Sequence, residues 1–158
     1  MAEDTLRLRR LHVRRLRELA VDVRELTPAE TRAALGQFAS VFLGVTRAPA
    51  FLLEVDAAQT SGREVKYGQW LSHGQPPPTL RPRFGWLSNW MPGTTCIRFE
   101  RNASLPALRL SIAPMLDEWA LSWPGAYVSF DAQRAMIVSL DLDVTCYDPS
   151  PTRNTPYR

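Results

Sequence analysis

The stretch AYVSFDAQRAMIVSLDLDVTCYD, residues 126–148, decides the fold of this chain. Two runs rich in β-branched and aromatic residues, 126–131 and 135–147, are separated by the short segment AQR. This spacing predicts an antiparallel hairpin. In the second run an apolar set of residues alternates with a set that includes Asp141 and Asp143. We therefore expect a hairpin with one buried face and one acidic face.

Upstream of the hairpin, the motif TPAE at residues 27–30 marks the start of a helix. Thr27 can cap the helix, Pro28 suits its first position, and Glu30 can bond back to the cap. Gly44 can adopt the left-handed conformation that ends a helix. The helix between them is predicted to pack on the core through one face, which carries Leu35, Phe38, Phe42 and Val45.

The segments AFLLEVD, residues 50–56, and REVKYGQW, residues 63–70, are interpreted as two strands of a further hairpin. The proline-rich segment 73–85 is expected to be an exposed loop, since proline cannot donate to a sheet ladder. Together these patterns predict an α+β fold in which one capped amphipathic helix packs on a mainly antiparallel sheet that ends in the C-terminal hairpin. We expect a single domain over 27–148, preceded by a basic arm or helix at 1–26 and followed by a flexible tail at 149–158.

Two tryptophan-containing segments resemble each other. WLSNWMPGTTCIRFE at 86–100 and WALSWPGAYVSFD at 119–131 each contain two tryptophans four residues apart, then Pro-Gly, then a short apolar run. They predict two helix-turn-strand units packed side by side. A chance resemblance between short aromatic segments is the alternative.

The most basic part of the chain lies near its N-terminus. Residues 6–17 contain six arginines and no acidic residue, whereas residues 27–158 carry 12 Lys plus Arg against 11 Asp plus Glu. The spacing of the apolar residues favours a helix from residue 8 to residue 25, and the alternative is a strand with a slip. We expect these arginines to form a contact surface, for an acidic protein patch first and for nucleic acid second. The alternative is that they are simply solvated. The surface would consist of Arg7, Arg9, Arg10, Arg14, Arg15 and Arg17.

Signatures of catalysis are absent from the sequence. It contains no GxSxG, GxxxxGK[ST] or HExxH motif, and neither His12 nor His73 has a second histidine nearby. Cys96 and Cys146 lie in apparent strands and are interpreted as buried thiols. Asp141 and Asp143 could share a divalent cation with Asp148, but a solvated or partner-facing strand surface is preferred. We therefore expect a protein that is not an enzyme and that needs no metal and no cofactor.

One enzymatic alternative rests on the acidic residues Glu54, Asp56 and Glu64 together with Lys66. An aspartate that ends one strand, followed by E-x-K on the next, resembles the core of the PD-(D/E)xK nucleases, which hold magnesium with two carboxylates. The resemblance is degenerate, because the polar run QTSGR precedes Glu64 where that family has an apolar strand. A structural role for these residues is preferred.

No apolar run approaches the roughly 20 residues of a membrane span, and no apolar stretch of the kind found in a secretory signal follows the arginines. We expect a cytoplasmic protein without a membrane partner.

In its size, its missing site chemistry and its terminal hairpin AYVSFDAQRAMIVSLDLDVTCYD, the chain resembles bacterial polymorphic-toxin immunity proteins. The resemblance implies a small protein that neutralises a cognate toxin by binding it. Inhibitors of nucleases are often acidic, whereas this chain has a net charge of +3. The expected target surface is therefore acidic or mixed, and Asp141 and Asp143 join the arginines as expected contact residues.

Overall fold

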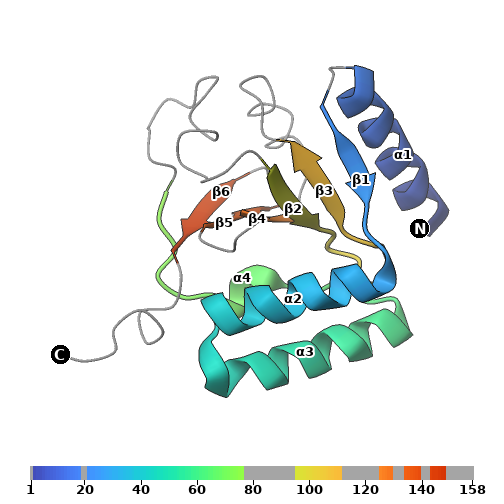
Figure 1. Cartoon of the computed structure of the whole chain (residues 1–158). Helices are drawn as coiled ribbons and strands as arrows, with labels where there is room; N and C mark the ends of the chain where they lie inside the picture. Colours follow the sequence, from blue (N-terminus) through green and yellow to red (C-terminus); the bar gives the residue numbers. More distant parts are fainter. Residues whose placement is uncertain are drawn as a thin grey trace.

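The computed structural model describes residues 2–18, 21–76, 95–111, 125–129, 134–139 and 143–148. Its helices are α1 (Ala2–Glu18), α2 (Pro28–Phe42), α3 (Gly44–Ser61) and α4 (Tyr67–Trp70), and its strands are β1 (Val23–Glu25), β2 (Thr95–Phe99), β3 (Leu108–Ser111), β4 (Gly125–Ser129), β5 (Ala135–Val138) and β6 (Val144–Tyr147). Within these residues the strands form one antiparallel sheet in the order β1-β3-β2-β4-β5-β6 (Figure 1). The predicted α+β fold is confirmed.

The start of α2 is as the sequence predicts. The Thr27 hydroxyl accepts a hydrogen bond from the Glu30 amide at 3.1 Å, and the Glu30 carboxylate accepts one from the Thr27 amide at 3.0 Å. Gly44 has a φ of 80°, which ends α2 and begins α3. The expectation for Val45 is wrong: it follows this break, so its side chain is 87% exposed and does not continue the buried face of α2.

The predicted hairpin over 50–70 is also wrong, because residues 44–61 form the helix α3 and 67–70 form α4. Phe51, Val55 and Ala58 are buried at spacings of four and three, which is the period of a helix. Gly62, with a φ of 69°, ends α3 by donating its amide hydrogen to the Ala58 carbonyl.

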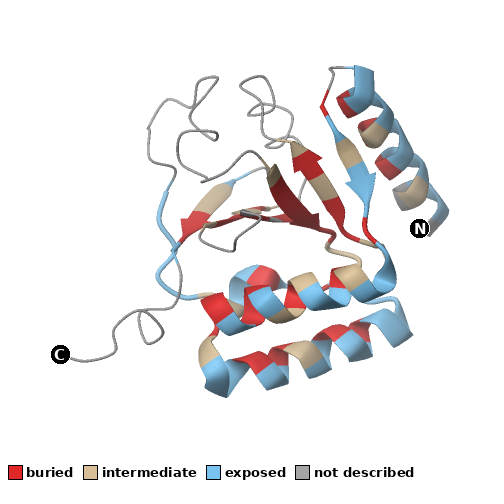
Figure 2. Ribbon diagram, viewed as in Figure 1, coloured by how far each residue is buried: buried red, intermediate tan, exposed pale blue. Residues whose placement is uncertain are grey.

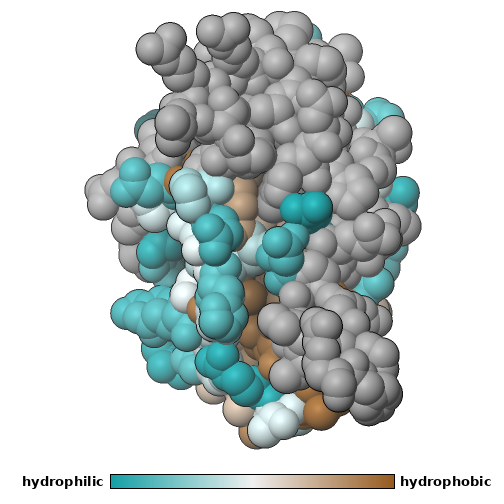
Figure 3. All heavy atoms as spheres, turned by 90° about the vertical axis from the view of Figure 1, so that its left-hand side faces the viewer, coloured by the Kyte–Doolittle hydropathy of each residue, from teal (hydrophilic) through white to brown (hydrophobic). Residues whose placement is uncertain are grey.

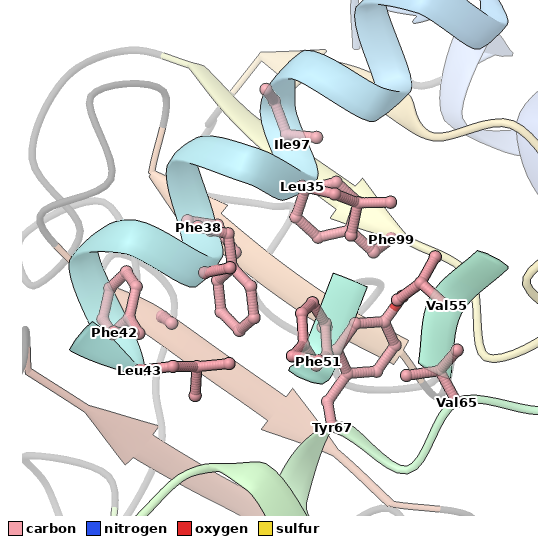
Figure 4. Close-up of a cluster of buried hydrophobic side chains, with 14 of the residues drawn as sticks. Leu35, Phe38, Phe42, Leu43, Phe51, Val55, Val65, Tyr67, Ile97 and Phe99 are labelled. Carbon is pink, nitrogen blue, oxygen red and sulfur yellow. The ribbon is translucent and has the colours of Figure 1, made fainter. Parts of the chain in front are cut away.

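The main core lies between the sheet and the pair α2 and α3. The Phe38 ring is central, with ring centroids 5.3 Å from Phe42, 5.7 Å from Phe51 and 5.9 Å from Phe99 (Figure 4). Figure 2 shows that the buried residues of both helices lie on the sides that face each other and the sheet. The attraction between aromatic rings at such distances adds to the stabilisation that comes from their burial. This cluster therefore holds both helices on the sheet.

The N-terminal segment forms α1 and then β1, so the helix predicted over 8–25 is wrong at both ends. The helix begins at Ala2, and residues 23–25 pair with β3, with Val23 opposite Leu110. Leu16 is fully buried in a second cluster that includes Leu110, Cys96 and Met136. Since neighbouring residues on a strand point to opposite faces, α1 packs on the side of the sheet opposite to α2 and α3.

The C-terminal hairpin of β4 and β5 is formed, but the second run is two strands instead of one. β5 and β6 pair with Ala135 opposite Tyr147. The Ser139 amide donates to the Asp143 carbonyl, and the Asp143 amide donates to the Ser139 hydroxyl. The single strand expected over 135–147 is therefore wrong, and Asp143 lies just before β6 instead of within a strand. Asp141, the other residue of the expected acidic face, is outside the described residues. Cys96 and Cys146 are buried free thiols on strands, as expected.

The two tryptophan-containing segments are adjacent where they can be followed. Their strand portions are β2 and β4, which pair antiparallel with Cys96 opposite Ser129. The expected helical turns with Trp86, Trp90, Trp119 and Trp123 lie outside the described residues, as does most of the proline-rich segment.

The outer edge of β6 is paired at one position with the chain that follows α4, which runs beside β6 in Figure 1. Gln75 and Cys146 exchange two backbone hydrogen bonds, of 2.8 and 2.7 Å. A Cβ atom on Gly74 would lie 2.5 Å from the Thr145 methyl carbon and 2.8 Å from the Tyr147 ring. Glycine is therefore the residue that allows this close approach.

Candidate functional site

The helical period of α1 divides its arginines between two sides. Arg9 is only 4% exposed and shares the sheet-facing side with the buried residues His12 and Leu16. The outer side carries an arginine stripe, defined here as Arg7, Arg10, Arg14 and Arg17, all of which are exposed. The spacings of three, four and three residues place the four side chains in a row about 15 Å long, at 1.5 Å of rise per residue.

Arg9 attaches α1 to the sheet. Its Nη1 atom lies 2.9 Å from Oε1 of Glu100, and its Nη2 atom donates to the Pro106 carbonyl at 2.7 Å and to the Glu25 carboxylate at 3.2 Å. The expectation that Arg9 belongs to an exposed contact surface is therefore wrong. Its guanidinium group binds partners inside the protein, because a buried cation needs anionic or carbonyl groups around it.

Glu100 joins α1 to the centre of the sheet. Its Oε1 atom also accepts a hydrogen bond of 2.8 Å from Nε of Arg98, whose side chain on β2 is fully buried. The backbone carbonyl of Glu100 accepts a hydrogen bond from the Tyr67 hydroxyl at 3.3 Å, which connects this ionic cluster with the aromatic core. One buried carboxylate thus lies between two buried arginines.

Arg98 and Glu100 are not among the residues predicted from the sequence. The available signal was their spacing: in TCIRFE, two opposite charges two residues apart follow an apolar run. Such residues share one face of a strand, which predicts a paired charge on a sheet face.

His12 lies beside this cluster and is not a surface histidine as expected. Burial, and then the positive charges of Arg98 and Arg9, lower its pKa from 6.5 to about 3. Protonation of His12 would add a third cation to a buried site that already holds two. The imidazole therefore remains neutral at physiological pH.

Beside the arginine stripe, the outer side of α1 carries mixed charge. Arg15 lies off the arginine stripe and forms an ion pair with Glu18 at 3.1 Å, and Arg14 lies 3.8 Å from the same carboxylate. Two leucines beside the stripe are half exposed, Leu8 at 50% and Leu11 at 49%. The acidic first turn and the basic last turn also match the helix dipole, so part of this charge pattern stabilises α1 itself.

The residues of the nuclease alternative do not form the geometry it requires. Asp56 lies on α3 instead of ending a strand, and its carboxylate pairs with Arg32 at 2.9 Å. Glu64 pairs with Arg101 at 2.8 Å. In the described part of the chain, no group of three His, Cys, Asp or Glu residues is placed to hold a metal ion. The two carboxylates face arginines instead of converging on one point.

The acidic residues of the C-terminal region are separated in a similar way. Asp143 is exposed just before β6, whereas Asp148 forms an ion pair of 2.9 Å with Arg134. Asp141 cannot be placed, because it is outside the described residues. His73 is exposed and has a φ of 62°, at the start of the segment that reaches β6. Asp143 and Asp148 thus supply separate surface charges.

Two open hollows lie near the start of α2 and beside β1. The first, of about 350 Å³, is lined in part by Thr27, Thr31 and Ser104, and the amides of Glu30 and Thr31 already donate to Thr27. The second, of about 330 Å³, includes Arg24, whose guanidinium group makes two hydrogen bonds to Glu30. These polar groups have partners within the protein.

Exposed apolar side chains also occur on α3, at Val45 and at Leu53, which is 69% exposed. Figure 3 shows the side of the molecule where α2 meets α3 in Figure 1, and hydrophobic atoms are visible there among hydrophilic ones. This second apolar surface differs from the outer side of α1, since no row of like charges accompanies it on α3.

Comparisons with protein-family models, curated proteins and solved structures found no match. None of the helices in the described residues is both long enough and apolar enough to cross a membrane.

Proposed function

We propose that the protein is a non-enzymatic protein-binding module, and most specifically an immunity protein that neutralises a cognate bacterial toxin by direct binding in the cytoplasm. The observation that carries the proposal is the attachment of α1 to the sheet through Arg9, which leaves the arginine stripe facing outward. A helix held in this way presents its side chains on a rigid support, which lowers the entropic cost of binding. Arginine is also enriched at protein interfaces.

Nucleic acid is the second candidate partner, and the arginine stripe itself favours it. Four guanidinium groups in a row can pair with successive phosphates, and such binding depends steeply on salt. For a protein partner bound through the same groups, the affinity depends less steeply on salt, and the main effect of salt is on the association rate. A salt titration therefore separates the two candidates.

The proposal is tested by affinity capture from the native host with three forms of the full chain. The native form is compared with Arg10→Gln/Arg14→Gln and with a control, Arg63→Gln/Lys66→Gln, which removes the same charge from exposed positions away from α1. We expect the native and control forms to retain one protein in stoichiometric amount and the stripe variant to lose it. Recovery of only the free monomer in all three cases would contradict the proposal.

The specific role as an immunity protein needs a second measurement. The captured protein is expressed alone, and together with this chain, in a bacterium that naturally has neither protein. We expect growth arrest in the first case and rescue in the second, with weaker rescue by the stripe variant. A captured protein that is harmless on its own would leave a binding module but exclude a toxin inhibitor.

A further inference from the structure

The half-exposed leucines of α1 form a unit with the arginine stripe. Leu8 and Leu11 are three residues apart, so they lie one above the other on the helix. Leu11 is four residues after Arg7 and three before Arg14, which makes it a direct neighbour of two stripe residues. The outer side of α1 is therefore an apolar pair with a row of positive charge along one flank only.

We propose that this surface binds an acidic amphipathic α-helix of a partner protein, packed lengthwise against α1; the inference rests on the proposed function. The leucine pair would contact the apolar side of the partner helix, and its carboxylates would pair with the arginine stripe. Two α-helices share the same pitch, so acidic residues spaced by three and four residues match the spacing of the arginines.

The charge distribution also fixes which side of the partner helix is acidic. The stripe lies on one flank of the leucines, whereas on the other flank His12, four residues after Leu8, is buried against the sheet. Arg15, four residues after Leu11, lies in line with the leucines and is already paired with Glu18. A partner helix with acidic residues on both flanks would leave half of them without cations. The matching helix is therefore acidic along one flank and apolar at its centre, and this asymmetry selects one docked orientation.

A nucleic acid fits this surface less well than a protein helix. Phosphates can pair with the arginines, but a sugar-phosphate backbone offers the leucine pair no matching apolar row. Binding of a duplex through four arginines predicts a slope of about −3.6 in log affinity against log salt concentration. Contribution from the leucines is the feature that distinguishes a protein helix.

The test uses the full chain and two synthetic helical peptides of about 18 residues each, long enough to span the stripe. The first peptide has an apolar stripe with glutamates along one flank, and the second has the same composition with its glutamates distributed around the helix. A DNA duplex is the third probe. Affinities are measured at several salt concentrations, and amide resonances of residues 7–17 report where each probe binds.

We expect the first peptide to bind about tenfold more tightly than the second and more tightly than the duplex at physiological salt. Both Leu8→Ser/Leu11→Ser and Arg10→Gln/Arg14→Gln should weaken it about tenfold, and Arg63→Gln/Lys66→Gln, away from α1, should leave the affinity within about twofold. Equal binding of the two peptides, no effect of the leucine variant, or tighter binding of the duplex would each overturn the inference. Thermal unfolding of every variant checks that the surface substitutions leave the fold intact.

The two proposals can fail separately. If the native host yields a protein partner but the acidic peptide does not bind α1, the inference about partner chemistry is wrong and the binding function stands. If the peptide binds as expected but no partner is captured, the surface chemistry is right and the proposed function is wrong.

Discussion

Arg9 and Glu100 form a buried ion pair, with 2.9 Å between Nη1 and Oε1 and 5% exposure of each side chain. The pair joins the first helix of the chain to the end of a central strand. The segment with the highest positive charge is thereby divided: one arginine holds the helix on the sheet, and the stripe on the outside is available for contact.

Replacement of Arg9 by alanine should destabilise the protein by about 3 kcal/mol, because it removes one partner of a buried pair and leaves the Glu100 carboxylate with less positive charge. Urea unfolding of the native chain and of Arg9→Ala measures the difference. Arg10→Ala, on the exposed side of the same helix, is the matched control and should change the stability by less than about 0.5 kcal/mol. Equal effects of the two substitutions would show that the buried pair is not an anchor.

The depressed pKa of His12 predicts a loss of stability in mild acid. In the unfolded chain the imidazole takes up a proton as the pH falls below 6.5, whereas in the folded protein its pKa is about 3. Between these values the unfolded state binds the additional proton, so the free energy of unfolding falls by up to about 1.4 kcal/mol per pH unit. More than about one pH unit above 6.5 this contribution is constant.

Urea unfolding at pH values from 7 to 5 checks this expectation with His12→Gln, which cannot take up the proton and should show a shallower dependence. The exposed His73 provides the control, since His73→Gln should retain the native slope. Glu30 does not interfere in this range: the hydrogen bonds from Arg24 and then from the Thr27 amide lower its pKa from 4.5 to about 2. Its stabilising contribution is therefore lost only below the range measured.

Thr27→Ala should cost about 1 kcal/mol, since it removes the side-chain acceptor for the Glu30 amide at the start of α2. Thr46→Ala, at an exposed threonine of α3, is the control, and we expect a smaller change there. Chemical denaturation of both variants gives the comparison. A Thr27→Ala protein as stable as the native one would mean that solvent replaces the cap without loss.

The two cysteines should react slowly with thiol reagents in the native protein. Burial raises the pKa of Cys96 to about 12 and that of Cys146 to about 11, so little thiolate is present at neutral pH. Labelling with a coloured disulfide reagent, with and without denaturant, measures this. We expect both thiols to react rapidly only after unfolding; fast labelling of the native protein would place at least one of them at the surface.

Local signals predicted the parts of the fold that depend on neighbouring residues. The capping box of α2 needs only Thr27, Pro28 and Glu30, which are adjacent in the sequence. The hairpin of β4 and β5 likewise follows from two short runs and the residues between them. In both cases the interactions that determine the structure join residues close together in the chain.

Other parts could not be predicted because the deciding interactions are distant. A short apolar run such as FLLEV is compatible with a strand or a helix, and its packing against Phe38 selects the helix. The burial of Arg9 was not predicted, because its partners Glu100 and Pro106 lie far along the chain. The helical conformation of α1 was therefore within reach of sequence analysis, but the side on which it docks was not.

The contact between Gln75 and the outer edge of β6 bears on how copies of this protein behave at high concentration. An open strand edge can recruit the strand of another molecule, which is a common route to aggregation. The two hydrogen bonds at Cys146 occupy that edge, and the missing side chain of Gly74 allows the covering segment to lie close. A bulkier residue at position 74 would displace this cover without touching α1. The main consequence of such a substitution would be self-association of the folded chain.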